Sequence, residues 1–391
     1  MTPFHAFCLA ALCGSSSAKA AFAQSDTSIT MPAPIIGHDS AAARQDSTPR
    51  RRGERFYHAK PYGSEAQFGP LNELLNEGFD MLRDENYDRH VLRRQYGIGA
   101  NTIITSLLHA DKTYRFYGYR RALRNEILPL TWSDNGTGGQ GWETKYSLHL
   151  IGSGMVSARL VEWGQQHGVS HPVLLSAVVM AASHFMNEIL ENGPSRLLNE
   201  DATTDFLIFN PGGFLLFQNE RVQRLFSDHV EFTNWPRQPA WVFESQTLEN
   251  TGQEFVLRGG LPRAKNWRWL CTFGLSTLFG VSYGEADGYS VSLAAGKDAI
   301  ATPIVDQRTG ARTATLRPKE SFFIDREGSL LASVDVGGTP HEVLASANVY
   351  PGALARLPQL PGAWIEILRG GGARFGVVSR LSIGLGSGPR H

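Results

Sequence analysis

The hydrophobic period of this chain changes once, near residue 240, and that change limits the folds open to it. Before this point apolar residues recur at helical spacing, whereas later they alternate with polar residues in short runs bounded by Gly, Asp or Pro. A single segment cannot have both periods, because side chains return to the same face about every 3.6 residues in a helix and every 2 in a strand. The order predicts an α+β protein, with a helical domain followed by a sheet.

The helical domain is expected over residues 65–235. Residues 68–83 place apolar side chains at helical spacing and predict a one-faced amphipathic helix. Residues 145–164 carry small side chains that allow helices to approach closely. A further helix is predicted from His171 to Asn192, because a proline suits the start of a helix and Gly-Pro its end.

The strand-forming part, residues 238–388, predicts an antiparallel β-barrel or barrel-like domain of about 8–10 strands. Its strictest alternation lies at 271–283 and 374–386, and each run is interpreted as one strand. The first is long enough to cross a bilayer and has a second face of small and polar residues, as in outer-membrane barrels. A soluble barrel of the lipocalin type remains an equal alternative.

The charge balance excludes one large class of partner. Lys and Arg total 37 and Asp and Glu total 37, so the formal net charge is zero. A general nucleic-acid binder needs a basic surface to neutralise phosphates. We therefore expect no nucleic-acid partner and leave protein partners open.

The first 60 residues predict export. Residues 1–23 have a short apolar core and end in Ala-Phe-Ala, which is typical of a signal peptide cleaved before Gln24. Residues 24–60 are rich in Ser, Ala, Pro, Asp and Arg, and predict a disordered linker. The expected location is the outer membrane or the periplasm. Cleavage would leave Cys271 as the single cysteine, which excludes an intrachain disulfide and a cysteine-based metal site.

A polar stripe interrupts the most hydrophobic helix. His184, Glu188 and Glu191 share one helical face, Asn187 borders it, and Asp205 follows inside another apolar run. The candidates His184, Glu188 and Asp205 allow three interpretations. They could bind a metal, act as an acid–base pair in a cleft, or form a buried network that joins the helices.

We favour the buried network, and we expect no metal and no cofactor. Glu188 and Asp205 would be buried acids paired with His149, His184 or Arg196, because an unpaired buried carboxylate is costly to keep ionised. Asn187, Glu191, Asn210 and Gly213 complete the set of polar or ligand-binding candidates.

Residues 145–218 resemble VanZ-like proteins and related bacterial envelope families. The likeness rests on Lys145 and His149 in "KYSLHLIGSG", then Glu188, then Arg196, then Asp205, Asn210 and Gly213 in "TDFLIFNPGG". The closest of these families join a helical hairpin to a C-terminal β-barrel. The resemblance implies an envelope location and this architecture, without a settled activity.

The expected function is a structural or accessory role at the outer membrane, with membrane or lipid as the partner and a hydrophobic ligand possible. The alternative is an envelope hydrolase or lipid-modifying enzyme that uses His184, Glu188 and Asp205.

Overall fold

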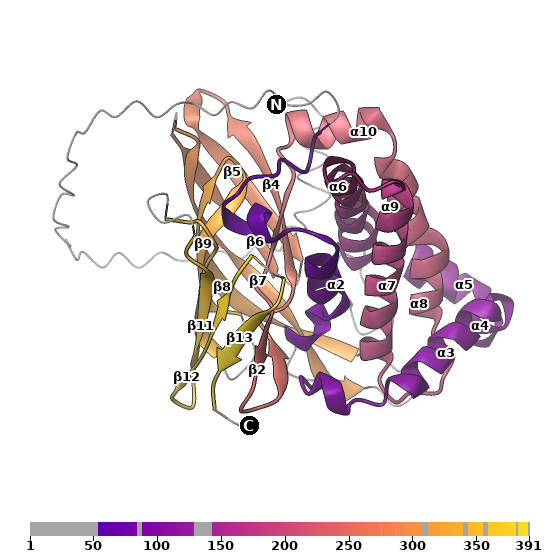
Figure 1. The fold of residues 1–391 in the computed structure, drawn as a ribbon. Helices are drawn as coiled ribbons and strands as arrows, with labels where there is room; N and C mark the ends of the chain where they lie inside the picture. The colour runs from indigo at the N-terminus through magenta and orange to yellow at the C-terminus, as the bar shows by residue number, and fades with distance from the viewer. Residues whose placement is uncertain are drawn as a thin grey trace, which may run out of the picture. The chain divides into compact units, whose positions relative to one another are not determined.

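The computed structural model describes residues 54–83, 88–128, 143–274, 276–285, 287–305, 312–338, 343–354, 359–380 and 382–389, without the side chains of 143–144 and 299–316. The residues from Glu54 onward form one compact unit in which helices gather along one side of a curled sheet (Figure 1). The α+β order predicted from the sequence is confirmed. The predicted signal peptide and residues 24–53 of the predicted linker lie outside the described residues.

The end of the predicted linker is built into the fold, so the prediction of disorder up to residue 60 is wrong there. Phe56 and Tyr57 are buried. The backbone N–H groups of Arg55, Phe56 and Tyr57 donate to the carboxylate of Glu162 at 2.7–2.9 Å. Two aromatic side chains give this short segment the apolar area that the residues before it lack.

The helices differ in their winding. The short elements η1 to η3 are 3-10 turns, and η4 to η7 have the wider π-type winding. In chain order the helices are η1 (Gly63–Gln67), α2 (Pro70–Gly78), η2 (Asp80–Arg83), η3 (Val91–Arg93), α3 (Tyr96–Leu108), α4 (Ala110–Tyr117), α5 (Tyr119–Ala122), η4 (Leu123–Ile127), η5 (Glu143–Gly152), α6 (Ser153–Gln166), α7 (Pro172–Asn192), α8 (Glu200–Thr204), η6 (Asp205–Phe209), α9 (Asn210–Phe217), α10 (Glu220–Arg224) and η7 (Leu225–His229).

Helix α7 begins and ends where the sequence predicts. Pro172 occupies its first turn, and Gly193 follows its last residue with a φ of 55°, a conformation that favours glycine. Among the described residues it is the one helix long and apolar enough to cross a membrane, a property that it shares with core helices of soluble proteins. It packs against α2, α3 and α6.

The single amphipathic helix predicted for residues 68–83 is divided into α2 and η2, and the polar side of α2 is the buried one. Asn72, Glu73, Asn76 and Glu77 are buried, whereas Leu71 is 52% exposed. Asn76 shows why, because its side chain donates to the carbonyl of Arg237 and accepts from the N–H of Gly252. The sheet presents backbone polar groups to this helix, so polar side chains fit the contact better than apolar ones.

The small residues of this region let the helices approach closely. A Cβ on Gly154 would lie 2.8 Å from the carbonyl oxygen of Gly213, and a Cβ on Gly213 would lie 2.5 Å from that of Leu150. Both obstacles are backbone atoms, so they cannot rotate away. Gly213, a candidate from the sequence, therefore sets the distance between α9 and η5.

Replacing Gly213 with alanine should lower the free energy of unfolding by about 1–3 kcal/mol, because the new methyl group overpacks the crossing. Gly212→Ala is the matched control in the same helix, where the nearest atom is Cδ1 of Leu150 at 3.2 Å, at the tip of a side chain. That control should be neutral or slightly stabilising, since alanine is the better helix former. Urea unfolding measures both variants, and equal stabilities would contradict the close contact.

The strands form one 13-stranded sheet, more than the predicted 8–10. They are β1 (Thr233–Pro236), β2 (Ala240–Val242), β3 (Thr247–Glu249), β4 (Gln253–Leu261), β5 (Ala264–Gly274), β6 (Ser276–Gly284), β7 (Tyr289–Val305), β8 (Arg312–Arg326), β9 (Ser329–Gly337), β10 (Val343–Val349), β11 (Gly362–Leu368), β12 (Ala373–Val378) and β13 (Gly384–Ser387). The strand order is β1-β4-β5-β6-β7-β8-β9-β10-β11-β12-β13-β2-β3. All pairs are antiparallel except β13 with β2.

The sheet curls, but it is not a closed barrel, because its order ends at β1 on one side and at β3 on the other. Its two ends are nevertheless close along the chain. Residues 237–239 join β1 to β2, and residues 250–252 join β3 to β4. These short links hold the ends near each other, which gives the barrel-like curl without closing the ladder.

Both runs interpreted as single strands are hairpins, so those two predictions are wrong. Residues 271–283 are divided between β5 and β6, where Cys271 pairs with Phe279. Residues 374–386 are divided between β12 and β13, where Gly376 pairs with Gly386. Alternation that continues through a turn has the same pattern as one long strand, and turn geometry is what separates the two.

The two faces of β6–β13 have opposite polarity. The outer face is exposed and mostly apolar, although Lys297 and Glu320 also lie on it. Its exposed apolar residues are Phe279, Val281, Tyr283, Val291, Leu293, Phe322, Val334, Val336, Leu344, Val349, Ile365, Ile367, Phe375, Val377 and Leu385. The inner face is buried and carries mostly polar residues, among them Ser276, Ser282, Ser290, Ser292, Asp298, Lys319, Ser321, Asp325, Ser333, Asp335, Ser346, Asn348 and Arg374. Trp235 and Phe323 add an aromatic contact to the core, with ring centroids 5.1 Å apart.

Candidate functional site

Lys145 is the centre of a buried polar network inside the helical part. It lies in η5 and is fully buried. Its Nζ is 2.8 Å from Oδ1 of Asp205 and 3.6 Å from Oε2 of Glu126, and it also donates to Asp201. Burial by itself lowers the pKa of Lys145, but these three acids raise the pKa well above its ordinary value, so the ammonium stays charged. One cation thus holds η4, α8 and η6 against η5.

His149 lies one turn after Lys145 and also contacts Asp205. Its Nε2 is 3.5 Å from Oδ2 of Asp205, and its Nδ1 is 3.1 Å from Oδ1 of Asn210. An amide oxygen only accepts, so with this amide orientation Nδ1 is the donor. One acid of the predicted network, Asp205, is therefore in contact with one of its expected basic partners, His149.

His184 belongs to a second group around Glu77. Its Nε2 is 3.4 Å from Oε1 of Glu77, and its ring centroid is 5.6 Å from that of His149. Ser153 and Ser183 donate their hydroxyls to the two carboxylate oxygens of Glu77, at 2.8 and 3.1 Å. Burial lowers the pKa of His184, although Glu77 opposes the shift. Both serines donate to an acid, an arrangement that suits a structural network.

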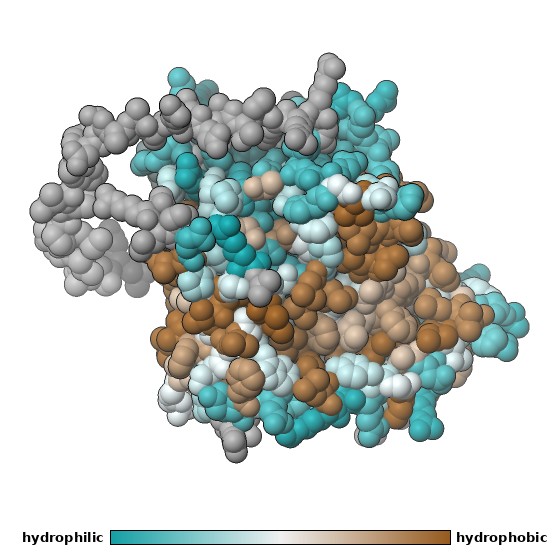
Figure 2. Space-filling view, viewed as in Figure 1, coloured by the Kyte–Doolittle hydropathy of each residue, from teal (hydrophilic) through white to brown (hydrophobic). Residues whose placement is uncertain are grey.

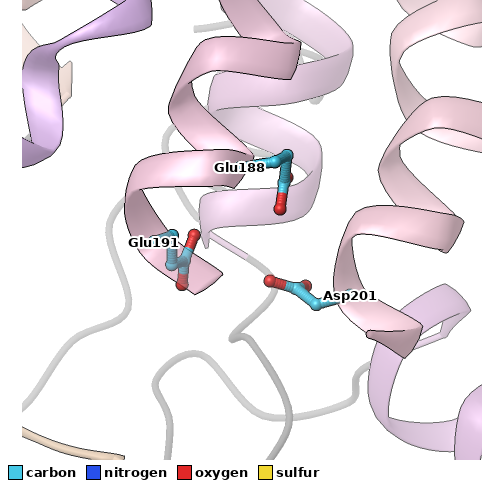
Figure 3. A group of neighbouring side chains, drawn as sticks. All are labelled: Glu188, Glu191 and Asp201. Carbon is cyan, nitrogen blue, oxygen red and sulfur yellow. The ribbon is translucent and has the colours of Figure 1, made fainter. Parts of the chain in front are cut away.

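Glu188, Glu191 and Asp201 form a third group, shown in Figure 3. The two glutamates lie on the last turns of α7 and point toward Asp201 on α8. One carboxylate oxygen from each lies within 4.8 Å of the others. Burial, followed by the charges of Asp201, Glu191 and Asp205, raises the pKa of Glu188 well above its ordinary value.

Asn187 connects α7 to the end of α2. Its Nδ2 donates to the carbonyl of Glu77 at 3.1 Å and to the side chain of Asp80. Burial and the nearby Glu77 raise the pKa of Asp80 to about 8. Asn187 therefore joins α7 to the backbone of Glu77 and to the carboxyl group of Asp80 without contributing a charge.

The structure places some of the candidates together and separates others. Glu188 and Asp205 are both buried, as expected. Asp205 has its expected partner His149, whereas Glu188 faces Glu191 and Asp201 instead of a histidine. Arg196 is exposed and lines a separate cavity with residues of α3, including Gly97, Asn101 and Thr102. Among the described residues, the acids spaced for a metal are Glu188, Glu191 and Asp201, not the set of His184, Glu188 and Asp205.

Three members of the network are absent from the candidates drawn from the sequence: Glu77, Glu126 and Asp201. A signal for Glu77 exists, because Asn72, Glu73, Asn76 and Glu77 recur at helical spacing on α2. Glu126 and Asp201 carry no such signal, since each comes from a short element that the tertiary structure brings to Lys145.

The His149–Asp205 and His184–Glu77 pairs lie next to each other through their two imidazole rings. Of the seven residues on which the resemblance rests, Lys145, His149, Asp205 and Asn210 are joined by pairwise contacts, whereas Arg196 lines the separate cavity. Comparison of the chain with models of protein families, with curated proteins and with solved structures found no match.

Proposed function

We propose that this chain is an integral protein of the bacterial cell envelope with a structural or accessory role at the outer membrane. Residues 1–23 would direct export. The outer face of β6–β13 would contact lipid acyl chains, while the helical part packs along one side of the curled sheet. The VanZ-like resemblance of residues 145–218 agrees with this location.

The observation that carries the proposal is the inverted polarity of the sheet. Lysine, arginine and aspartate side chains are buried on the inner face, while large apolar side chains are exposed on the outer face. A soluble sheet has the opposite arrangement, and outer-membrane strands have this one. On the face that Figure 2 shows, brown apolar residues form a band across the middle with teal polar regions above and below, as expected where a bilayer contacts that face.

The buried ion pairs of the sheet fit the same environment. Arg258 binds Asp325 through two hydrogen bonds at 2.8 and 3.1 Å, and Arg374 lies 3.3 Å from Glu249. Because the apolar residues face outward, such polar contacts must supply part of the interior packing. This supports a structural role more than the alternative, an envelope hydrolase or lipid-modifying enzyme using His184, Glu188 and Asp205.

Membrane extraction tests the proposal. The protein in envelopes of a Gram-negative host should stay in the pellet after alkaline carbonate or high salt and should dissolve in detergent. Release into the supernatant without detergent would show that the outer face is not inserted and would reject the proposal.

Leu293→Arg provides the mutational arm of this experiment. Leu293 lies on the outer face of β7 and is 62% exposed. In water this change should alter stability by less than about 0.5 kcal/mol, but at the centre of a bilayer it should cost about 2–4 kcal/mol. The fraction of assembled protein in the envelope measures the difference. Leu293→Met keeps the site apolar and should behave as the parent, and normal assembly of Leu293→Arg would count against lipid contact.

A further inference from the structure

The acids Glu188, Glu191 and Asp201 have a geometry that suits a metal ion. Each offers one carboxylate oxygen, and these oxygens lie within 4.8 Å of one another. Ca²⁺ binds oxygens at about 2.3–2.6 Å, so oxygens on one ion can lie up to about 5 Å apart. The three side chains come from two helices and converge on one space (Figure 3).

A second feature of Glu188 points to a ligand at this place. The side chain is 97% buried, with 3% exposed, and it points toward the other two acids. Its Oε2 has no hydrogen-bond partner among the described residues. Buried polar atoms nearly always have a partner, so an unsatisfied carboxylate oxygen directed at two other acids calls for a positive group between them.

The neighbouring lysine does not fill this role. Lys145 donates to Asp201, but its ammonium also serves Asp205 and Glu126. One positive charge therefore already faces three carboxylates before Glu188 is counted. Additional positive charge beside Glu188 would reduce the repulsion within this group of acids.

We propose that Glu188, Glu191 and Asp201 bind one divalent cation of the hard, oxygen-ligated class, Ca²⁺ or Mg²⁺. The ligands are carboxylates without histidine or cysteine, a set that suits these ions better than zinc or copper. The ion joins the end of α7 to α8 across residues 193–199, which makes it a clamp on the helical hairpin next to Lys145. This site differs from the set of His184, Glu188 and Asp205 considered from the sequence.

Calorimetry and thermal melts of the full chain in detergent, stripped with EDTA, test the site. Titration with CaCl₂, and separately with MgCl₂, should show binding of one ion and a raised melting temperature for at least one of the two. Glu188→Gln and Glu191→Gln keep the side-chain shape, and each should weaken binding by about tenfold or more. Glu191 is partly exposed, so its variant remains informative if Glu188→Gln does not fold.

Glu220→Gln is the matched control. It removes an acid of the helical part that pairs with Arg224 on α10 and is not part of the group, and this variant should still bind one ion. Absence of both heat and a melting shift in the parent with either ion would overturn the proposal. Binding of equal strength in the parent and both glutamine variants would also overturn it, as would a parent that binds Zn²⁺ but neither Ca²⁺ nor Mg²⁺.

Discussion

Replacing Lys145 with methionine should lower the free energy of unfolding by about 3–5 kcal/mol, the usual cost of removing one partner from a buried ion pair. Methionine has a similar length but no charge, so Asp201, Asp205 and Glu126 would lose the cation that they share. The measurement is a thermal melt of the purified chain in detergent, together with urea unfolding.

Asp205→Asn is the companion variant. It removes one carboxylate while Lys145 keeps Asp201 and Glu126, so the loss of stability should be clear but smaller than for Lys145→Met. This pair also separates the two functional hypotheses, because loss of a catalytic acid often leaves stability unchanged or improved. If both variants melt at or above the temperature of the parent, the network is not structural, and a search for enzymatic activity at Asp205 is justified.

Asp335→Asn should also cost about 3–5 kcal/mol, in this case within the sheet. Asp335 is 1% exposed on the inner face of β9, where its carboxylate binds Arg237 and accepts from Ser321 at 2.6 Å, with Nζ of Lys319 at 3.7 Å. The neutral amide would leave two buried cations without their shared acid. Urea unfolding followed by tryptophan fluorescence measures the effect.

Glu320→Gln is the control for that experiment. Glu320 lies on the neighbouring strand β8, opposite Val336, and its side chain is exposed. Its loss leaves no buried cation without a partner, so it should not lower stability by more than about 0.5 kcal/mol. Equal effects at positions 320 and 335 would mean that charge on the inner face does not hold the strands together.

The sequence by itself determined the order of helices and sheet, the limits of α7 and the alternation within each strand. These features depend on residues that are close together in the sequence. Pro172 and Gly193 fix the ends of α7 through their own backbone preferences, and the alternation of Ser282 with Val281 and Tyr283 follows from strand geometry.

The tertiary structure decided which side of each element faces inward. Alternation separates two faces of a strand without saying which is buried, so the inner position of Asp335 and the outer position of Leu293 depend on how the sheet curls. Tertiary packing also decided that the polar side of α2 is buried, because this side contacts the links at the ends of the sheet, where Asn76 binds Arg237 and Gly252. Turn geometry likewise decided that residues 271–283 form a hairpin.

The site depended even more on the tertiary structure. His149 and Asp205 could be proposed as partners because each is a charged or polar residue in an apolar run. Glu126 and Asp201 could not, because they meet Lys145 from elements 19 and 56 residues away along the chain. Spacing along one helix places side chains only relative to that helix, and contacts between helices are set by the packing of the whole unit.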